Sequence, residues 1–253
     1  MNEIKIISVE AKNKYYVVTT NKDDYKFEED TIVKYGIFND KTFSIDEFNK
    51  IIKDNDNILA FNKVLRYLGY GPRSKKEIIK YLKEKGVTDY KVVINKLSEY
   101  GYIDDHKLAN EIVAYYKNNN KGPLFILKKL NEKGIDAQTI TKAIMQYDQQ
   151  EERDICFEVG KKEVAKLSEY PIKKQKQSLY SKLVAKGFNI DVIHYVIEKV
   201  EYIDNSNEML LKDYNKLLNK VAKKELSDNE KRNYIVNHLL AKGYEYSSIK
   251  SIL

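Results

Sequence analysis

Side chains that could perform acid–base, nucleophilic or metal chemistry are few in this sequence and lie far apart. The three histidines are His106, His194 and His238, and the single cysteine is Cys156. One cysteine excludes an internal disulfide and a metal site built on several thiolates. The segments "YGPRS" and "KGP" lack the G-x-x-x-x-G-K-[ST] spacing that cradles a phosphate. We therefore find no catalytic constellation, expect no cofactor or metal, and treat an enzyme as the weakest hypothesis.

The residues best suited to bind a partner are basic. The 253 residues include 45 Lys and Arg against 38 Asp and Glu, for a formal net charge of +7. Residues 1–57 hold nine Lys and twelve Asp and Glu, net −3, so the remainder carries net +10. A basic body favours a polyanionic partner, although a lysine-rich solvated surface would explain the same composition.

Many of these cations surround four segments that resemble one another: "LKEKGV" (82–87), "LNEKGI" (130–135), "LVAKGF" (183–188) and "LLAKGY" (239–244). A basic stripe repeated in this way suits a phosphate track or an extended acidic protein surface, and it would not read base sequence. A solvated outer face is the alternative. The candidate binding residues are Arg66, Arg73, Lys75, Lys76, Lys80, Lys83, Lys121, Lys128, Lys129, Lys133, Lys173, Lys174, Lys176 and Lys182.

Tyrosine is frequent, with 21 residues against no Trp, and exposed rings can stack on nucleic-acid bases. Most of these tyrosines fit half-buried positions in helices. Tyr67, Tyr70 and Tyr102 flank helix breaks and are the better candidates for surface aromatics.

Each of the four similar segments is a complete helix stop. A glycine at C′ adopts the left-handed conformation without strain, and the Schellman motif joins an apolar residue at C3 to another at C″. The preceding lysine lies at the negative end of the helix dipole. The glycines are 48, 53 and 56 residues apart, which indicates an internal repeat. They are Gly86, Gly134, Gly187 and Gly243.

Apolar residues at helical spacing place one helix before and one after each repeated helix. The fold class is therefore mainly α, a tandem array of four helix-turn-helix-like three-helix units over 58–104, 105–149, 150–202 and 203–253. Residues 1–57 predict a small α+β domain with a three-stranded antiparallel sheet and two helices, the second opened by a Ser44–Glu47 capping box. "KDNDN" (53–57) indicates the boundary between the domain and the array.

Three-helix units are typical of DNA readers whose third helix contacts base edges. None of the four expected third helices contains arginine, the commonest reader of guanine. This argues against four base-reading modules but leaves a direct DNA-binding protein, architectural or regulatory, as the alternative function.

Three segments, "VLRYLGYGPRSKKEIIKYL", "KLSEYGYIDDHKLA" and "KGPLFILKKLNEKGI", resemble the RecX family of regulators of the RecA recombinase. Arg66 in "VLRY" and Arg73 in "GPRS" match that family's pattern. The resemblance implies a protein without activity of its own that binds RecA filaments on single-stranded DNA. It would restrain the filament and lower strand exchange and ATP hydrolysis.

The partners expected on this basis are the RecA filament and DNA, single-stranded or alternatively duplex, bound weakly and without sequence preference. No run approaches the ~20 apolar residues needed to cross a membrane, and no signal peptide is evident. We expect a cytoplasmic protein, monomeric and without a membrane partner.

Overall fold

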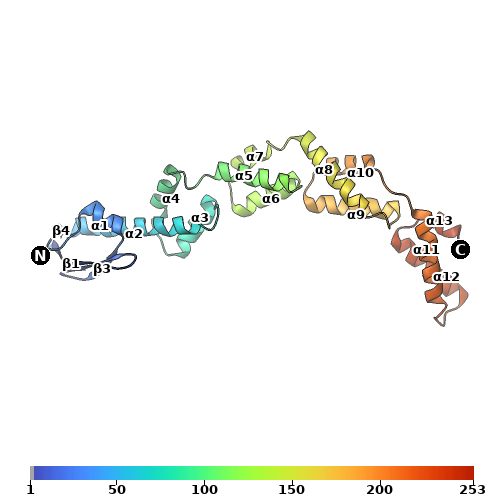
Figure 1. Ribbon diagram of the computed structural model, residues 1–253, viewed down its shortest axis with the longest axis horizontal. Helices are drawn as coiled ribbons and strands as arrows, with labels where there is room; N and C mark the ends of the chain where they lie inside the picture. Colours follow the sequence, from blue (N-terminus) through green and yellow to red (C-terminus); the bar gives the residue numbers. More distant parts are fainter. Residues whose placement is uncertain (1–2) are drawn as a thin grey trace. The chain divides into compact units, whose positions relative to one another are not determined.

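A computed structural model describes residues 3–253 of the chain (Figure 1). The residues form two compact units. One extends to Ala109 and includes Glu132–Thr139, and the other comprises Asn110–Asn131 and Ile140–Leu253. None of the helices described is both long enough and apolar enough to cross a lipid bilayer.

The chain begins with an antiparallel sheet of four strands in the order β3-β2-β1-β4. The strands are β1 (Glu3–Ala11), β2 (Tyr16–Thr20), β3 (Asp24–Phe27) and β4 (Thr42–Ser44). The three predicted strands are confirmed, but the prediction of only three was wrong, because β4 pairs with β1 through Ile4 and Phe43. Helix α1 (Glu29–Tyr35) ends at Gly36, as expected.

Helix α2 (Ile45–Leu68) begins with the predicted capping box between Ser44 and Glu47. The break expected at 53–57 is absent, because α2 runs through these residues. Asn55 is buried there and accepts hydrogen bonds from the Glu28 amide at 2.8 Å and the Thr31 hydroxyl at 2.9 Å. These partners satisfy an amide side chain that would otherwise favour a loop.

The array that follows consists of four three-helix repeats, each with a long or medium first helix and a second helix that carries the repeated segment. The first repeat uses α2 with α3 (Lys75–Glu84) and α4 (Tyr90–Glu99), and the second uses α5 (Asp105–Asn118), α6 (Pro123–Lys133) and α7 (Ala137–Ile144). The third uses α8 (Gln149–Ala165), α9 (Ile172–Lys186) and α10 (Ile190–Lys199). The fourth uses α11 (Ser206–Val221), α12 (Asp228–Lys242) and α13 (Tyr246–Lys250).

Each repeat buries apolar side chains at helical spacing. The leucine of each repeated segment is fully buried, as the periodicity predicts. The exceptions to the predicted stripe are Leu127 and Tyr180, which are 38% and 37% exposed. The buried leucines are Leu82, Leu130, Leu183 and Leu239.

The helix stops have the expected geometry. Gly86 and Gly187 have φ of 75° and 81°. The Val87 amide donates to the Leu82 carbonyl at 3.0 Å, and the Tyr244 amide donates to the Leu239 carbonyl at 3.2 Å. These are the C″-to-C3 hydrogen bonds of the Schellman motif. We call the four lysine–glycine pairs at 85–86, 133–134, 186–187 and 242–243 the Lys-Gly stops.

Candidate polyanion-binding surface

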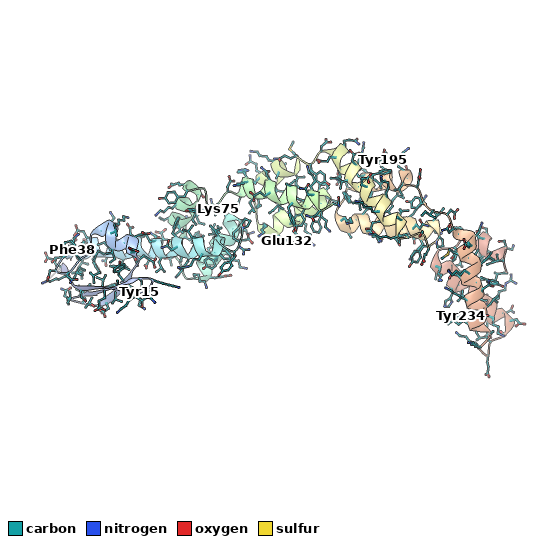
Figure 2. All side chains as sticks on the ribbon, viewed as in Figure 1. Tyr15, Phe38, Lys75, Glu132, Tyr195 and Tyr234 are labelled. Carbon is teal, nitrogen blue, oxygen red and sulfur yellow. The ribbon has the colours of Figure 1, made fainter. Side chains whose placement is uncertain are left out.

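The start of α3 lies against the Lys-Gly stop of α6. The Ser74 hydroxyl donates to the Lys133 carbonyl at 2.5 Å, and Glu77 forms an ion pair with Lys133 Nζ at 3.0 Å. A Cβ on Gly134 would lie 2.2 Å from Cδ of Lys76. Figure 2 labels Lys75 and Glu132, which mark the two sides of this junction. The junction therefore gathers basic residues from two successive second helices.

A second junction joins the start of α6 to the Lys-Gly stop of α9. The Gly122 amide donates to the Lys186 carbonyl at 2.8 Å, and the Leu124 amide donates to the Gly187 carbonyl at 2.9 Å. A Cβ on Gly187 would lie 2.3 Å from the backbone nitrogen of Phe125, so only glycine allows this approach. Lys121 Nζ lies 4.6 Å from the centre of the Phe125 ring, within cation–π range.

A third junction joins the start of α9 to the Lys-Gly stop of α12. A Cβ on Gly243 would lie 3.2 Å from Cβ of Lys174, and Lys173 Nζ lies 3.4 Å from a Glu245 oxygen. The sequence signal for the junctions is the repeated lysine–glycine pair, which we interpreted only as a helix stop. In the structure the pair also carries the contact between repeats.

The predicted binding residues differ in exposure. Because Arg73, Lys129 and Lys133 lie off the apolar stripe of the sequence, the pattern predicts that they are exposed with the rest. This prediction was wrong, since all three are half-buried. Lys121, Lys174 and Lys182 are also half-buried. The exposed members are Arg66, Lys75, Lys76, Lys80, Lys83, Lys128, Lys173 and Lys176.

Several of these cations are neutralised within the chain. Besides the Lys133–Glu77 pair, Lys182 donates to Glu163 at 2.7 Å. Hydrogen bonds from Lys182 and Lys166 hold the pKa of Glu163 below its ordinary value, so the carboxylate stays ionised. Lys80 lies 4.0 Å from Glu84 on an exposed face, where an ion pair contributes little. Lys133 and Lys182 are thus weaker candidates for binding a polyanion than sequence suggested.

Arg73 and Tyr67 belong to an aromatic and cationic stack. The Tyr67 and Tyr81 rings stack with centroids 4.4 Å apart and an interplanar angle of 8°. The Arg73 guanidinium carbon lies 4.7 Å from the Tyr67 centroid, and Lys85 Nζ lies 5.6 Å from the Tyr81 centroid. Tyr67, which we expected as a surface aromatic, is half-buried and already stacked. Tyr70 and Tyr102 are exposed, at 84% and 50%.

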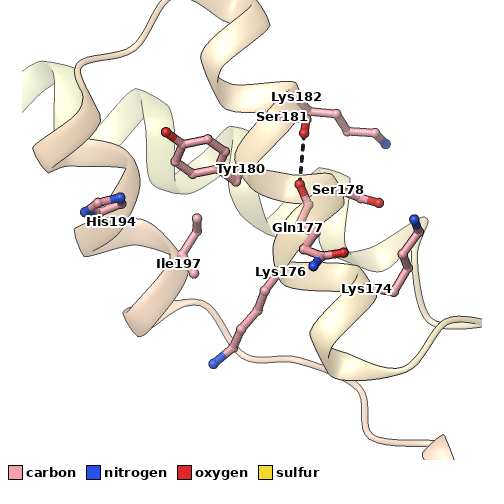
Figure 3. A pocket seen from close by; sticks show the side chains of 9 residues that line it. All are labelled: Lys174, Lys176, Gln177, Ser178, Tyr180, Ser181, Lys182, His194 and Ile197. Carbon is pink, nitrogen blue, oxygen red and sulfur yellow. Dashed lines mark hydrogen bonds between the residues drawn. The ribbon is translucent and has the colours of Figure 1, made fainter. Parts of the chain in front are cut away.

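The third repeat contains an open pocket of about 880 Å³ between α9 and α10 (Figure 3). The Tyr180 and His194 rings lie 6.0 Å apart across it, tilted by 32°. Three predicted binding residues, Lys174, Lys176 and Lys182, also line it. The other lining residues are Gln177, Ser178, Ser181 and Ile197.

This pocket can offer cations to phosphate groups and ring faces to a base. Sequence reasoning missed both rings: Tyr180 follows Leu179 in the apolar pattern of the repeated helix, and His194 is a lone histidine, a type of residue that is usually structural. Both are exposed. They come from different helices, so their spacing in the sequence carries no signal.

The described residues contain no group of three or more His, Cys, Asp and Glu side chains that could hold a metal ion. Cys156 is fully buried, and burial raises the pKa of its thiol to about 12. His106 lies 3.3 Å from the Thr139 hydroxyl, and the His238 ring packs on Tyr234 with centroids 3.9 Å apart. Cys156 therefore serves packing, whereas His106 and His238 are exposed and contact residues of their own repeats.

The chain is similar to known proteins that share one name. A family model for the first three-helix domain of RecX matches residues 60–90. "Regulatory protein RecX" of Staphylococcus aureus strain JH9 is 27% identical and aligns over 100% of this chain and 95% of its own length. "Regulatory protein RecX" of Streptococcus agalactiae is 29% identical, over 99% of this chain and 98% of its own.

Solved structures share the fold. A crystal structure of regulatory protein RecX covers 78% of this chain and 100% of its own, with a TM-score of 0.63 and 23% identity. RecX from Lactobacillus salivarius covers 58% and 97%, with a TM-score of 0.55 and 26% identity. The family model and the full-length relatives agree, and by both comparisons this chain is similar to RecX proteins.

Proposed function

We propose that the chain regulates the RecA recombinase in the cytoplasm by binding the filament that RecA forms on single-stranded DNA. It restrains filament growth, and so lowers ATP hydrolysis and strand exchange by RecA, with no catalytic activity of its own. Similarity to proteins named "Regulatory protein RecX" supports the regulatory role, and the basic second helices support a polyanionic partner.

One observation carries the proposal most directly. Each of the three junctions brings the start of one second helix, with its lysines, to the lysine that ends the next. Cations from successive repeats therefore meet at each junction. Many weak contacts along a polymeric partner add together through effective concentration, so no single strong site is required.

The test compares charge variants of equal net charge. Lys174 and Lys176, which line the pocket on α9, are both changed to Gln, and the control changes Lys14 and Lys22 of the sheet domain, both exposed. Both variants fall from +7 to +5. We expect only the first to bind RecA filaments more weakly and to show a shallower salt dependence. The log–log slope should fall by ~0.7 for every phosphate of a single strand that is no longer neutralised.

The functional readout is the steady-state ATPase rate of RecA on single-stranded DNA. The parent chain should lower this rate at substoichiometric amounts, and the Lys174→Gln, Lys176→Gln variant should need a higher concentration for the same effect. An unchanged ATPase rate at several-fold molar excess over RecA would reject the regulatory role.

Direct DNA binding is the second candidate, favoured by the Tyr180–His194 pair beside lysines. A pull-down that compares RecA filaments with bare single-stranded and duplex DNA separates the two functions. Retention on bare DNA at least as strong as on filaments would favour the direct DNA-binding function.

A further inference from the structure

Each of the three junctions pairs the start of one second helix with the Lys-Gly stop of the next. Among the residues described, the Lys-Gly stop of α3 and the start of α12 take part in none of these junctions. Gly86, in the first Lys-Gly stop, is exposed, and a Cβ there would meet no atom within 4 Å. In the fourth repeat, the start of α12 is exposed throughout residues 227–230. By contrast Ser74, Gly122 and Pro171, at the starts of α3, α6 and α9, are buried.

The two unused parts match the chemistry of the first junction. There, Ser74 and Glu77 form a capping box, and both side chains contact Lys133. The Ser74 hydroxyl donates to the Lys133 carbonyl, and the Glu77 carboxylate accepts from Lys133 Nζ. Helix α12 begins with the same pair: Ser227 and Glu230 form a capping box, with the Ser227 amide donating to Glu230 at 2.8 Å. The lysine equivalent to Lys133 in the first repeat is Lys85, which is exposed.

We propose that the start of α12 in one copy of the chain docks on the Lys-Gly stop of α3 in a second copy. Ser227 and Glu230 then hold Lys85 as Ser74 and Glu77 hold Lys133. The contact is head-to-tail, and it rests on the repeat geometry alone, independently of the function proposed above.

The surface around Gly86 is open and carries lysines that could contact the start of α12 of a second copy. A hollow of about 420 Å³ opens there between α2 and residues 85–89, and its lining includes Lys53, Lys63 and Lys85. Lys53 is paired with Asp89 at 3.0 Å and Asp56 also lines the hollow, which leaves Lys63 and Lys85 as its other cations. The first turn of α12 presents Asp228 and Glu230, and Lys231 and Arg232 follow. The charge match is therefore between Glu230 and Lys85.

A head-to-tail contact of this kind is heterologous, so each added copy leaves a new open end. One junction is a small contact, and we expect the chain to remain monomeric when dilute. On a long partner that binds many copies, neighbours would meet at high effective concentration and associate. Terminal repeats with polar outer faces are the alternative, since they commonly cap such arrays.

Cysteine cross-linking between two copies tests the proposal. One copy carries Glu84→Cys, at an exposed position beside the stop that leaves Lys85 in place, and the other carries Asn229→Cys. Mild oxidation is applied after mixing. Native Cys156 can stay, because its thiol is fully buried. The matched control replaces Glu84→Cys by Glu99→Cys, which also lies two residues before an exposed left-handed glycine, Gly101, with no atom within 4 Å of its Cβ position.

We expect the Glu84→Cys and Asn229→Cys pair to form mixed dimers several-fold faster than the Glu99→Cys and Asn229→Cys pair. Adding Glu230→Gln to the Asn229→Cys copy should remove most of this advantage, because Gln keeps the capping box but loses the charge that would hold the partner. Equal cross-linking rates for the two pairs would overturn the proposal and favour the alternative, in which the first and fourth repeats cap the array.

A photo-cross-linker attached to Glu84→Cys identifies what contacts this Lys-Gly stop when RecA filaments are present. With RecA filaments on single-stranded DNA added, capture of a second copy of the chain supports the proposal. Capture of RecA alone overturns it and assigns this end to the recombinase. Neither result depends on whether the chain lowers the RecA ATPase rate, so the two proposals can fail separately.

Discussion

The carbonyl oxygen of Gly187 accepts a hydrogen bond from the amide of Leu124 at 2.9 Å, which ties the end of α9 to the start of α6. This approach is possible because the glycine has no side chain. The same helix-ending glycine therefore serves a local turn and a contact between repeats, and the two roles can be separated by mutation.

Gly187→Ala should destabilise the chain more than Gly86→Ala. Both glycines have positive φ, and strain alone costs of order 1 kcal/mol at either position. At Gly187 the new methyl would also lie 2.3 Å from the Phe125 nitrogen, whereas at Gly86 it would meet nothing within 4 Å. We expect a total destabilisation above about 3 kcal/mol for Gly187→Ala. Urea melts followed by circular dichroism measure the loss of stability in both variants. Equal losses would contradict a role for Gly187 in the contact between repeats.

Asp213→Asn should destabilise the fourth repeat by ~1–3 kcal/mol near neutral pH. Burial alone would raise the pKa of Asp213, but hydrogen bonds from Lys242 at 2.6 Å and Tyr244 at 2.9 Å outweigh it and lower the pKa below its ordinary value of 3.8. A lowered pKa gives stability that is present above pH 3.8 and is lost as the pH falls further.

The difference in unfolding free energy between parent and Asp213→Asn should therefore shrink below that pH. The control is Asp40→Asn, which removes an exposed ion pair with Lys5 and should change stability by less than ~0.5 kcal/mol. A parent–variant difference that is constant from neutral to strongly acidic pH would show that the Asp213 charge contributes nothing.

Cys156 should resist thiol reagents in the native state. Burial raises its pKa to about 12, so at pH 8 only about one thiol in ten thousand is ionised, and the side chain is fully covered. Labelling with a disulfide reagent should follow the opening of the third repeat and accelerate in urea. Rapid stoichiometric labelling without denaturant would show that this core is open.

Arg73→Gln should cost ~0.5–1.5 kcal/mol, because the guanidinium packs 4.7 Å from the centre of the Tyr67 ring. Arg66→Gln is the control, since Arg66 is exposed on α2, and should change stability by less than ~0.5 kcal/mol. Thermal melts of the two variants measure the difference. Identical melting temperatures would show that Arg73 is available to a partner instead.

The sequence predicted the repeats well because each helix stop is encoded locally, in a leucine, a lysine, a glycine and one apolar residue. The continuity of α2 was not predictable in this way, since Asn55 becomes favourable inside a helix only through contacts with Glu28 and Thr31. Strand β4 spans three residues and is defined by pairing with β1.

The candidate surface was predicted in part. Its lysines could be named because charge is visible in the sequence. The pairing of Lys133 with Glu77 and of Lys182 with Glu163 joins residues 56 and 19 positions apart, and no local pattern reports it. The approach of Tyr180 to His194 likewise depends on how α9 packs on α10.

The unbroken α2 has a consequence for how the molecule melts. Phe48 and Ile51 on this helix belong to the core beneath the sheet, while Ala60 and Val64 belong to the core of the first repeat. Fraying of α2 at either core would destabilise the other core as well. The core beneath the sheet and the core of the first repeat should therefore melt in one cooperative transition. A truncated chain starting at residue 58 would begin in mid-helix, and its first repeat should be less stable than in the whole protein.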